Sequence, residues 1–142
     1  MNEMEIAQHC KDAMYSRDAA AQELGITIEI LAVGCAEAHF EVLPKMVQGH
    51  DFCHGGYIFA LADTAFAYAC NCRNRVTVAA SAAIEFLRPA KVGDVLTAVA
   101  KERFVGGRSG LFNVVVRNQD DVEIALFRGR SHRLEGTLLG EI

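Results

Sequence analysis

The stretch His54-Gly-Gly-Tyr-Ile-Phe-Ala-Leu-Ala-Asp-Thr-Ala-Phe-Ala-Tyr-Ala-Cys-Asn71 decides the fold that we predict for this chain. From Tyr57 to Cys70 it is apolar on nearly every side of a helix, with one Asp and one Thr as its polar interruptions. Glycine occurs only at its start, and its Ala and Leu residues favour a helix. A helix that is apolar all round belongs inside a protein. We therefore predict a central helix over about residues 55–71.

Asp63 is an acid in the middle of this predicted core helix. An ionised carboxylate in such a place is costly unless it is paired, hydrogen-bonded or reached by water through a cleft. Partial burial would also raise its pKa and make it a better base. Two interpretations stay open: an aspartate satisfied by neighbouring donors, or a general base or nucleophile in a dry cleft.

Length and composition exclude several classes of protein. A chain of 142 residues with 51% hydrophobic residues predicts one globular domain over residues 1–142. The net charge of −4 argues against a general nucleic-acid binder. The 14-residue run from Tyr57 to Cys70 is shorter than the roughly 20 residues that span a bilayer. Five cysteines without a disulfide spacing, and no signal peptide, predict a cytoplasmic protein that does not bind a membrane.

The charge is unevenly divided between the two halves of the chain. Residues 1–71 carry three Lys or Arg against ten Asp or Glu, whereas residues 72–142 carry eleven against eight. Solvated strand edges are one explanation. An anion site in the second half, such as one for phosphates, is the other.

The remaining segments predict an α+β fold. Residues 3–23 read as one N-terminal helix, and the tail from Leu134 reads as frayed. Alternating and β-branched runs predict six strands, over residues 26–33, 35–43, 75–87, 95–105, 111–117 and 122–132. The first two would form a hairpin and the last four a continuous antiparallel meander. We predict that this curved sheet wraps around the central helix.

His54, Gly55 and Gly56 open the central helix, where uncrowded backbone amides and the helix dipole suit an oxyanion. Gly55 and Asp63 are eight residues apart, or about 12 Å along a helix. One helix cannot easily place both groups on one carbonyl. The simplest solution is a homodimer in which the helix start of one chain faces Asp63 of the other.

Three weaker motifs each allow a functional and a plain explanation. Arg108, Ser109 and Gly110 follow Gly107 at a strand connection and could hold a phosphate, although a plain hairpin explains them as well. The aromatic residues Tyr57, Phe59, Phe66 and Tyr68 could line a pocket, but core packing is their default role. The spacing of Cys53, His54, Cys70 and Cys72 does not match a zinc site, so we expect no metal.

These residues together resemble the hotdog-fold acyl-CoA thioesterases, most closely those of the PaaI type from phenylacetic acid degradation. The similarity rests first on His54-Gly-Gly-Tyr-Ile-Phe-Ala-Leu-Ala-Asp63. It is supported by Thr64 to Asn71, Phe86-Leu-Arg-Pro89, Gly93-Asp94 and Ala125-Leu-Phe-Arg-Gly-Arg-Ser-His132. It covers nearly the whole chain.

The resemblance implies a hotdog sheet around one helix, dimers that commonly form tetramers, and hydrolysis of coenzyme A thioesters, often aryl-acyl ones. Coenzyme A is then part of the substrate, and no cofactor is expected. Asp63 would activate water or attack the thioester carbon, the Gly55 amide would polarise the carbonyl, and His54 would position the thioester. By the same resemblance coenzyme A would contact Arg108, Ser109, Gly110 and Arg88, with Arg130 as a further candidate. The family usually carries Asn where this chain has Gln48, whose amide reaches one methylene further.

Two other functions are compatible with the same fold. One is a non-catalytic acyl-CoA-binding protein, which would have no need of an acid at position 63. The other is a hotdog dehydratase, which would place a His and an acid around a hydroxyacyl chain. Release of free thiol from acyl-CoA would identify a thioesterase, and an enoyl product would identify a dehydratase. A binding protein would give neither product.

Overall fold

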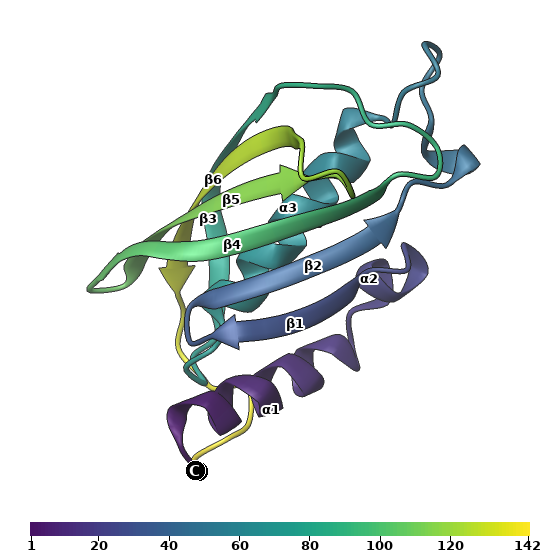
Figure 1. The fold of residues 1–142 in the computed structure, drawn as a ribbon. Helices are drawn as coiled ribbons and strands as arrows, with labels where there is room; N and C mark the ends of the chain where they lie inside the picture. Colours follow the sequence, from purple (N-terminus) through teal and green to yellow (C-terminus); the bar gives the residue numbers. More distant parts are fainter.

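In the computed structural model, which describes residues 1–142, helix α3 (Gly55–Cys70) lies against one face of a six-stranded antiparallel sheet (Figure 1). The helices α1 (Glu3–Tyr15) and α2 (Ala19–Glu23) lie beside the edge of that sheet. The predicted curved sheet around one central helix is confirmed. The bounds predicted for α3 differ from the observed ones by one residue.

Every predicted strand is present, within two residues at each end. The strands are β1 (Thr27–Ala32), β2 (Cys35–Glu41), β3 (Thr77–Phe86), β4 (Val95–Gly106), β5 (Ser109–Arg117) and β6 (Glu123–Arg133), and a 3-10 turn η1 (Pro44–Met46) follows β2. β1 and β2 form the predicted hairpin, with Gly34 at φ 82° in its turn.

The order of the strands in the sheet corrects the predicted meander. The order is β1-β2-β4-β5-β6-β3, so β3 pairs with β6 at one edge and β4 pairs with β2 in the middle. The segment between β3 and β4 crosses the sheet because it is tied to the end of β2: Val42 donates to the Asp94 carbonyl, and Gly93 donates to the Val42 carbonyl. Turn signals in the sequence mark where strands end but not which strands pair.

The single N-terminal helix predicted over residues 3–23 is wrong. The chain breaks between α1 and α2, where the Asp18 carboxylate accepts a hydrogen bond from the Ala21 amide at 3.0 Å. Asp is a strong helix N-cap because its side chain satisfies an amide that has no partner in the first turn. The polar turn at residues 16–18 therefore starts a new helix.

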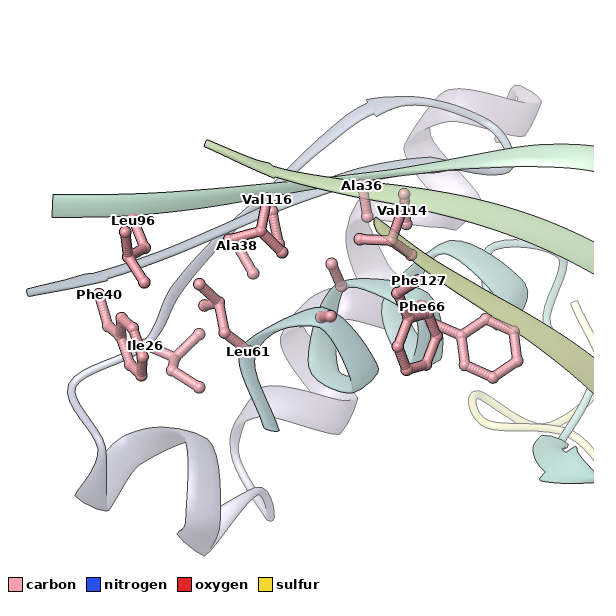
Figure 2. Close-up of a cluster of buried hydrophobic side chains, with 14 of the residues drawn as sticks. Ile26, Ala36, Ala38, Phe40, Leu61, Phe66, Leu96, Val114, Val116 and Phe127 are labelled. Atoms are coloured by element: carbon pink, nitrogen blue, oxygen red, sulfur yellow. The ribbon is translucent and has the colours of Figure 1, made fainter. Parts of the chain in front are cut away.

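The core fills the space between α3 and the sheet (Figure 2). Leu61 and Phe66 on the helix meet a layer of strand side chains, which includes Ala36, Ala38, Phe40, Leu96, Val114, Val116 and Phe127. The small residues on β2 let the helix approach closely. At Gly129 a Cβ would lie 2.7 Å from the Phe66 ring, so that position on β6 has no room for a side chain.

The tail after β6 is held in place, which contradicts the predicted frayed end. The Asn74 side chain accepts hydrogen bonds from the amides of Leu138 and Leu139 and donates to the Gly140 carbonyl at 2.8 Å. The C-terminus therefore lies beside α1 (Figure 1). Local composition predicts flexibility, but a buried Asn from a distant loop supplies the missing backbone partners.

Candidate functional site

His54 caps the start of α3. Its backbone is extended, with φ −61° and ψ 134°, and its Nδ1 accepts a hydrogen bond from the Gly56 amide at 3.0 Å. The His54 amide in turn donates to the Met46 carbonyl at 2.7 Å. The first turn of the helix is thus fixed to the loop before it, and the remainder of the exposed imidazole ring faces solvent.

The Gly55 amide is left without a hydrogen-bond acceptor in the chain, because His54 satisfies the neighbouring Gly56 amide. It stands at the positive end of the α3 dipole, where a developing negative charge is stabilised. A Cβ at Gly55 would lie 2.9 Å from the ring of Phe86 at the end of β3. Glycine at this position therefore leaves room for both the Phe86 ring and a carbonyl oxygen.

Asp63 lies two turns further along α3 and is half-buried. Its carboxylate accepts no hydrogen bond and forms no ion pair within the chain. Neither of its oxygen atoms is fully buried, so both remain accessible. Burial raises the pKa of the Asp63 carboxyl above its ordinary value. It is an acid in an apolar setting that water or a substrate can still reach.

One face of α3 remains uncovered, which refines the prediction of a helix buried on every side. Phe59, Asp63, Ala67 and Cys70 recur every three or four residues and are all half-buried, whereas the face that carries Leu61 is fully buried. The apolar surface around Asp63 is thus larger than one chain covers. Thr64 is not free for chemistry, because its hydroxyl donates to the Ala60 carbonyl at 2.6 Å.

Gln48 lies in the loop before α3, and its side-chain oxygen accepts a hydrogen bond from the His50 amide. Its backbone amide donates to the Phe52 carbonyl at 2.8 Å. The side-chain carbonyl of Gln48 therefore stabilises the loop in which the residue lies. The Gln48 NH₂ group has no partner within the chain.

The predicted coenzyme A contacts fall into two places. Arg88 donates to the Glu123 carbonyl at 2.8 Å, at the start of β6, whereas the Arg108 carbonyl accepts from the Arg133 amide at the end of β6. The two ends of the 11-residue strand β6 lie roughly 30 Å apart. Within one chain, Arg88 and Arg108 therefore cannot share a ligand's phosphates.

Ser109 and Gly110 begin β5 beside Arg108. Gly110 is buried, and a Cβ there would lie 2.7 Å from the Ser131 hydroxyl, so close packing explains this glycine. Ser109 is half-buried and pairs with His132 across the sheet. Arg130 lies exposed on β6.

The four aromatic residues of α3 divide between core and open face. Phe66 and Tyr68 are buried, and the Tyr68 hydroxyl donates to Asp18 at 3.0 Å, so the core role predicted as their default is confirmed. Tyr57 and Phe59 are only half-buried. Phe59 stacks edge-on against Phe127, with ring centroids 5.3 Å apart, one turn before Asp63.

Sequence reasoning did not single out Arg75 and Arg133, which line a pocket together with Arg108. The only signal for them was the excess of Lys and Arg in the second half of the chain. The chain contains no group of three or more His, Cys, Asp or Glu side chains placed to hold a metal ion. None of its helices combines the length and the apolar character that spanning a bilayer requires.

Comparison with known proteins identifies the family. The model of the thioesterase superfamily matches residues 50–125, which include the start of α3 and Asp63. The chain is 48% identical over 129 residues to the acyl-coenzyme A thioesterase PaaI of Escherichia coli K12, covering 91% of this chain and 92% of that protein. This chain belongs to the thioesterase superfamily. Its reaction class, as predicted, is thioester hydrolysis.

Solved structures of thioesterase-superfamily relatives confirm the hotdog architecture. The E. coli PaaI protein, from a phenylacetic acid degradation operon, superposes with a TM-score of 0.93 at 45% identity, over 96% of this chain and 99% of that one. A mutant of the phenylacetic acid degradation protein PaaI from Thermus thermophilus gives a TM-score of 0.79 at 35% identity, over 82% and 100%.

Proposed function

We propose that this thioesterase hydrolyses (hydroxy)phenylacetyl-CoA, or a similar aryl or medium-chain acyl-CoA, to the free acid and coenzyme A. The observation that carries the proposal is Asp63, a half-buried carboxylate without a partner on the same helix as an unsatisfied Gly55 amide. The E. coli relative is an acyl-coenzyme A thioesterase, which supports coenzyme A as the thiol.

The two groups act on one thioester only if two chains combine. Gly55 and Asp63 are eight residues apart on one unbroken helix, or about 12 Å. We propose that β3 is the contact, because it is the outer strand of the sheet beyond β6 and is exposed along nearly its whole length. Its small residues from Ala79 to Ala83 let a second backbone approach.

Antiparallel pairing of β3 with β3 of a second copy would give a two-fold dimer. It would cover the open face of α3 and bring Asp63 of one chain towards Gly55 of the partner subunit. Each dimer would then hold two equivalent sites. We propose further assembly into a dimer of dimers, for which the half-exposed Val99 and Val115 on the outer sheet face offer apolar contact.

In this dimer the Gly55 amide stabilises the negative charge that develops on the thioester oxygen. Asp63 either takes a proton from an attacking water or attacks the carbonyl carbon itself, forming an anhydride that water then cleaves. On either route the C–S bond breaks, coenzyme A leaves as the thiol after protonation, and water supplies the oxygen of the acid. The apolar surroundings strengthen the interaction of the Gly55 amide with the thioester oxygen and that of the Asp63 carboxylate with water or the carbonyl carbon.

His54 and Gln48 hold the loop and the helix start that present the Gly55 amide. The free NH₂ group of Gln48 could then donate to the attacking water or the substrate. Phe59 is half-buried one helical turn from Asp63, which favours an aromatic acyl group. We place the enzyme in the cytoplasm, because all five cysteines are free thiols.

A panel of aryl-acyl and alkyl-acyl coenzyme A thioesters, assayed by release of free thiol, tests the proposal. We expect the highest kcat/KM with phenylacetyl-type substrates and loss of hydrolysis in Asp63→Asn. Thiol release that is unchanged in Asp63→Asn would refute the assigned role of Asp63. An equal preference for straight-chain substrates would refute the aryl assignment but not the reaction.

A further inference from the structure

The ring of Phe86, the last residue of β3, points at the start of α3. A Cβ at Gly55 would lie 2.9 Å from Cζ of Phe86, 3.2 Å from Cε1 and 3.4 Å from Cε2. These three atoms form the tip of the ring, so the ring meets the Gly55 α-carbon end-on. The Gly55 amide nitrogen is bonded to that carbon. The ring tip therefore borders the amide that has no acceptor in the chain.

Backbone hydrogen bonds fix the strand end that carries this ring. Phe86 pairs with β6, and the Leu87 amide donates to the Ile124 carbonyl at 2.8 Å. The Cys53 amide, just before α3, donates to the Ala90 carbonyl at 2.8 Å. The segment after β3 is thus joined both to the sheet and to the loop that leads into α3. The fold therefore sets the position of the Phe86 ring.

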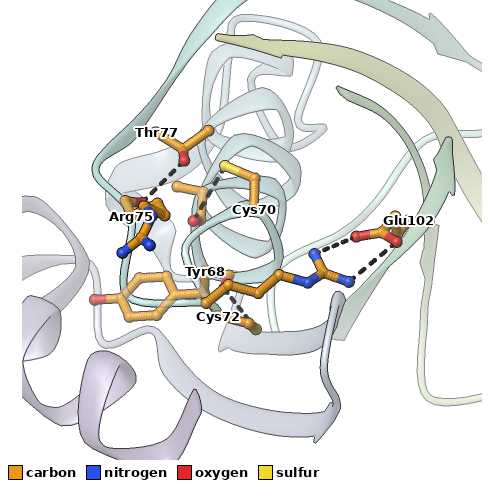
Figure 3. Close-up of polar contacts among 8 residues, drawn as sticks. Tyr68, Cys70, Cys72, Arg75, Thr77 and Glu102 are labelled. Carbon is orange, nitrogen blue, oxygen red and sulfur yellow. Dashed lines mark hydrogen bonds and ion pairs between the residues drawn. The ribbon is translucent and has the colours of Figure 1, made fainter. Parts of the chain in front are cut away.

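The start of β3 is held against the other end of α3. The Asn71 side chain, which follows the last turn of α3, donates to the Thr77 carbonyl at 2.9 Å and accepts from the Thr77 amide at 3.0 Å. The Thr77 hydroxyl donates to the Arg75 carbonyl at 3.0 Å (Figure 3). Strand and helix are joined at both ends, so β3 cannot slide along α3 and carry the ring away from Gly55.

Core packing does not account for this phenylalanine. Ile84 lies on the same face of β3, is half-buried and packs against the core, whereas Phe86 is 53% exposed. An exposed apolar residue needs no special explanation by itself. Phe86 differs because the tip of its ring lies against Gly55, whose amide is the proposed donor to the thioester oxygen.

A ring in this place excludes water from the helix start. An amide hydrogen bond to a developing negative charge is stronger where water is excluded, because the effective dielectric constant is lower. The ring tip occupies the space on the α-carbon side of the Gly55 amide, which water would otherwise fill. It also limits the positions that a carbonyl oxygen can take at that amide, which favours the reactive orientation.

We propose that Phe86 is a positioning residue for the oxyanion site: its ring keeps water from one side of the Gly55 amide and confines the thioester oxygen to the other. The inference rests on the proposed function, which takes this amide as the donor to that oxygen. Phe86 acts on Gly55 of its own chain, and therefore on the thioester that reacts with Asp63 of the partner subunit.

Two substitutions of nearly equal volume test the role of the ring tip. Leu and Met are both apolar and similar in size, but only the unbranched Met side chain extends as far as the tip of a phenylalanine ring. We expect Phe86→Leu to lower kcat for acyl-CoA about tenfold with KM within about twofold, because the oxyanion forms only in the transition state. Phe86→Met should stay within about threefold of the wild-type kcat.

Phe104→Leu is the matched control. Phe104 is 58% exposed, and the tip of its ring lies against Gly106, where a Cβ would be 2.7 Å from Cζ, rather than against α3. We expect its kcat to equal that of the wild type. An unchanged kcat in Phe86→Leu would overturn the proposal. Equal losses in Phe86→Leu and Phe86→Met would also overturn it, since reach to Gly55 would then not matter.

Gly55→Ala displaces the ring without changing Phe86. The new methyl group would lie 2.9 Å from Cζ, and the exposed ring can turn away from it, while the amide of residue 55 remains. We expect kcat to fall about as far as in Phe86→Leu, and the double variant to lose little more than either single variant. Losses that multiply in the double variant would show that the two residues act independently, against the proposal.

Circular dichroism and light scattering establish whether each variant is folded and assembled like the wild type. If Phe86→Leu does not assemble, Gly55→Ala decides alone. A lower kcat with an unchanged KM then supports the role of the ring, and an unchanged kcat overturns it.

Mixed dimers test which subunit the ring serves. A chain with Asp63→Asn is combined with a chain that carries Phe86→Leu, and two affinity tags isolate the mixed species. Its one active Asp63 then faces Gly55 of the subunit whose Phe86 is intact. We expect about half of the wild-type kcat per dimer, because one of the two sites is complete. About one twentieth would show that the ring acts in the chain that supplies Asp63, which contradicts the assignment.

The proposed function and the role of Phe86 can fail separately. Hydrolysis of acyl-CoA with the same kcat in Phe86→Leu would refute the role of Phe86 and keep the thioesterase. The opposite result is no hydrolysis of acyl-CoA by the wild type, together with hydrolysis of the same acyl group on N-acetylcysteamine that falls in Phe86→Leu. It would refute coenzyme A as the thiol and keep the role of Phe86.

Discussion

His54 Nδ1 lies 3.0 Å from the Gly56 amide nitrogen, so the side chain that caps α3 satisfies the second glycine and leaves the first one free. The cap thereby selects which amide of the Gly-Gly pair can bind an oxyanion. It also holds the start of the helix that carries Asp63. Stability and presentation of the Gly55 amide are thus linked through one residue.

Replacing His54 measures how much this cap contributes to stability. We expect His54→Ala to lower the free energy of unfolding by about 1 kcal/mol, because the Gly56 amide loses its acceptor. His54→Asn, which can also cap a helix, should restore most of that loss. Thermal unfolding measures the change. A stability of His54→Ala equal to that of the wild type would show that the cap contributes nothing.

Asp63→Asn should abolish hydrolysis and stabilise the fold. Loss of a general base or nucleophile lowers kcat by at least about 10²-fold. The raised pKa of Asp63 means that its ionised form is less stable in the folded protein than in the unfolded chain. At neutral pH the Asn variant should therefore melt at a higher temperature. A lower melting temperature would contradict an unpaired, desolvated carboxylate.

The raised pKa of Asp63 also predicts how stability and hydrolysis depend on pH. The destabilisation caused by ionised Asp63 is absent below the ordinary aspartate pKa, grows as the pH rises from that value to the raised pKa of the folded protein, and is constant above it. The melting-temperature difference between Asp63→Asn and wild type should thus shrink at acid pH. The acid limb of kcat/KM should have its midpoint above about 3.9, the ordinary value. A midpoint at or below that value would contradict the role of Asp63 as the base.

A charge on the exposed strand β3 should prevent dimer formation. Ala82 is exposed and lies in the middle of that strand, so Ala82→Asp buries a charge only if a second chain pairs there. We expect a folded monomer by light scattering, with thiol release reduced to background. Ala20→Asp, at an exposed position on α2, is the matched control. An active monomer would show that one chain forms a complete site.

The close packing of Gly129 on β6 against Phe66 on α3 predicts that a larger residue at position 129 lowers stability. Gly129→Ala places a Cβ 2.7 Å from two Phe66 ring carbons, and Phe66 is buried and cannot move aside. We expect a loss of about 1–3 kcal/mol in the free energy of unfolding, measured in urea. Gly107→Ala meets nothing within 4 Å and differs only in its positive φ of 59°, so it measures backbone strain without a clash.

Several elements followed from the sequence because their causes are local. The bounds of α3 come from its two glycines, its helix-forming Ala and Leu residues and the Asn71 that ends it. The β1–β2 hairpin follows from alternation around Gly34. The break between α1 and α2 was missed, although its cause, the Asp18 cap, is also local, because continuous helical spacing outweighed it.

Asp63, Gly55 and His54 were recognisable as candidate site residues because each is unusual for its place along the chain: an acid in an apolar helix, and a histidine and a glycine at its start. Arg75 and Arg133 were not, since an exposed arginine beside a strand is ordinary. Only the joining of residues 75, 108 and 133 by hydrogen bonds between distant segments brings them to one pocket.

The sequence by itself determined the central helix, the strands around it and the acid within it, because hydrophobic periodicity and turn residues act over a few positions. Tertiary structure decided which strands are neighbours and that β3 is an exposed edge strand. It also decided that Arg88 and Arg108 contact opposite ends of β6. The physical reason is that strand pairing is set by backbone hydrogen bonds and burial between segments far apart in the chain, which no local pattern encodes.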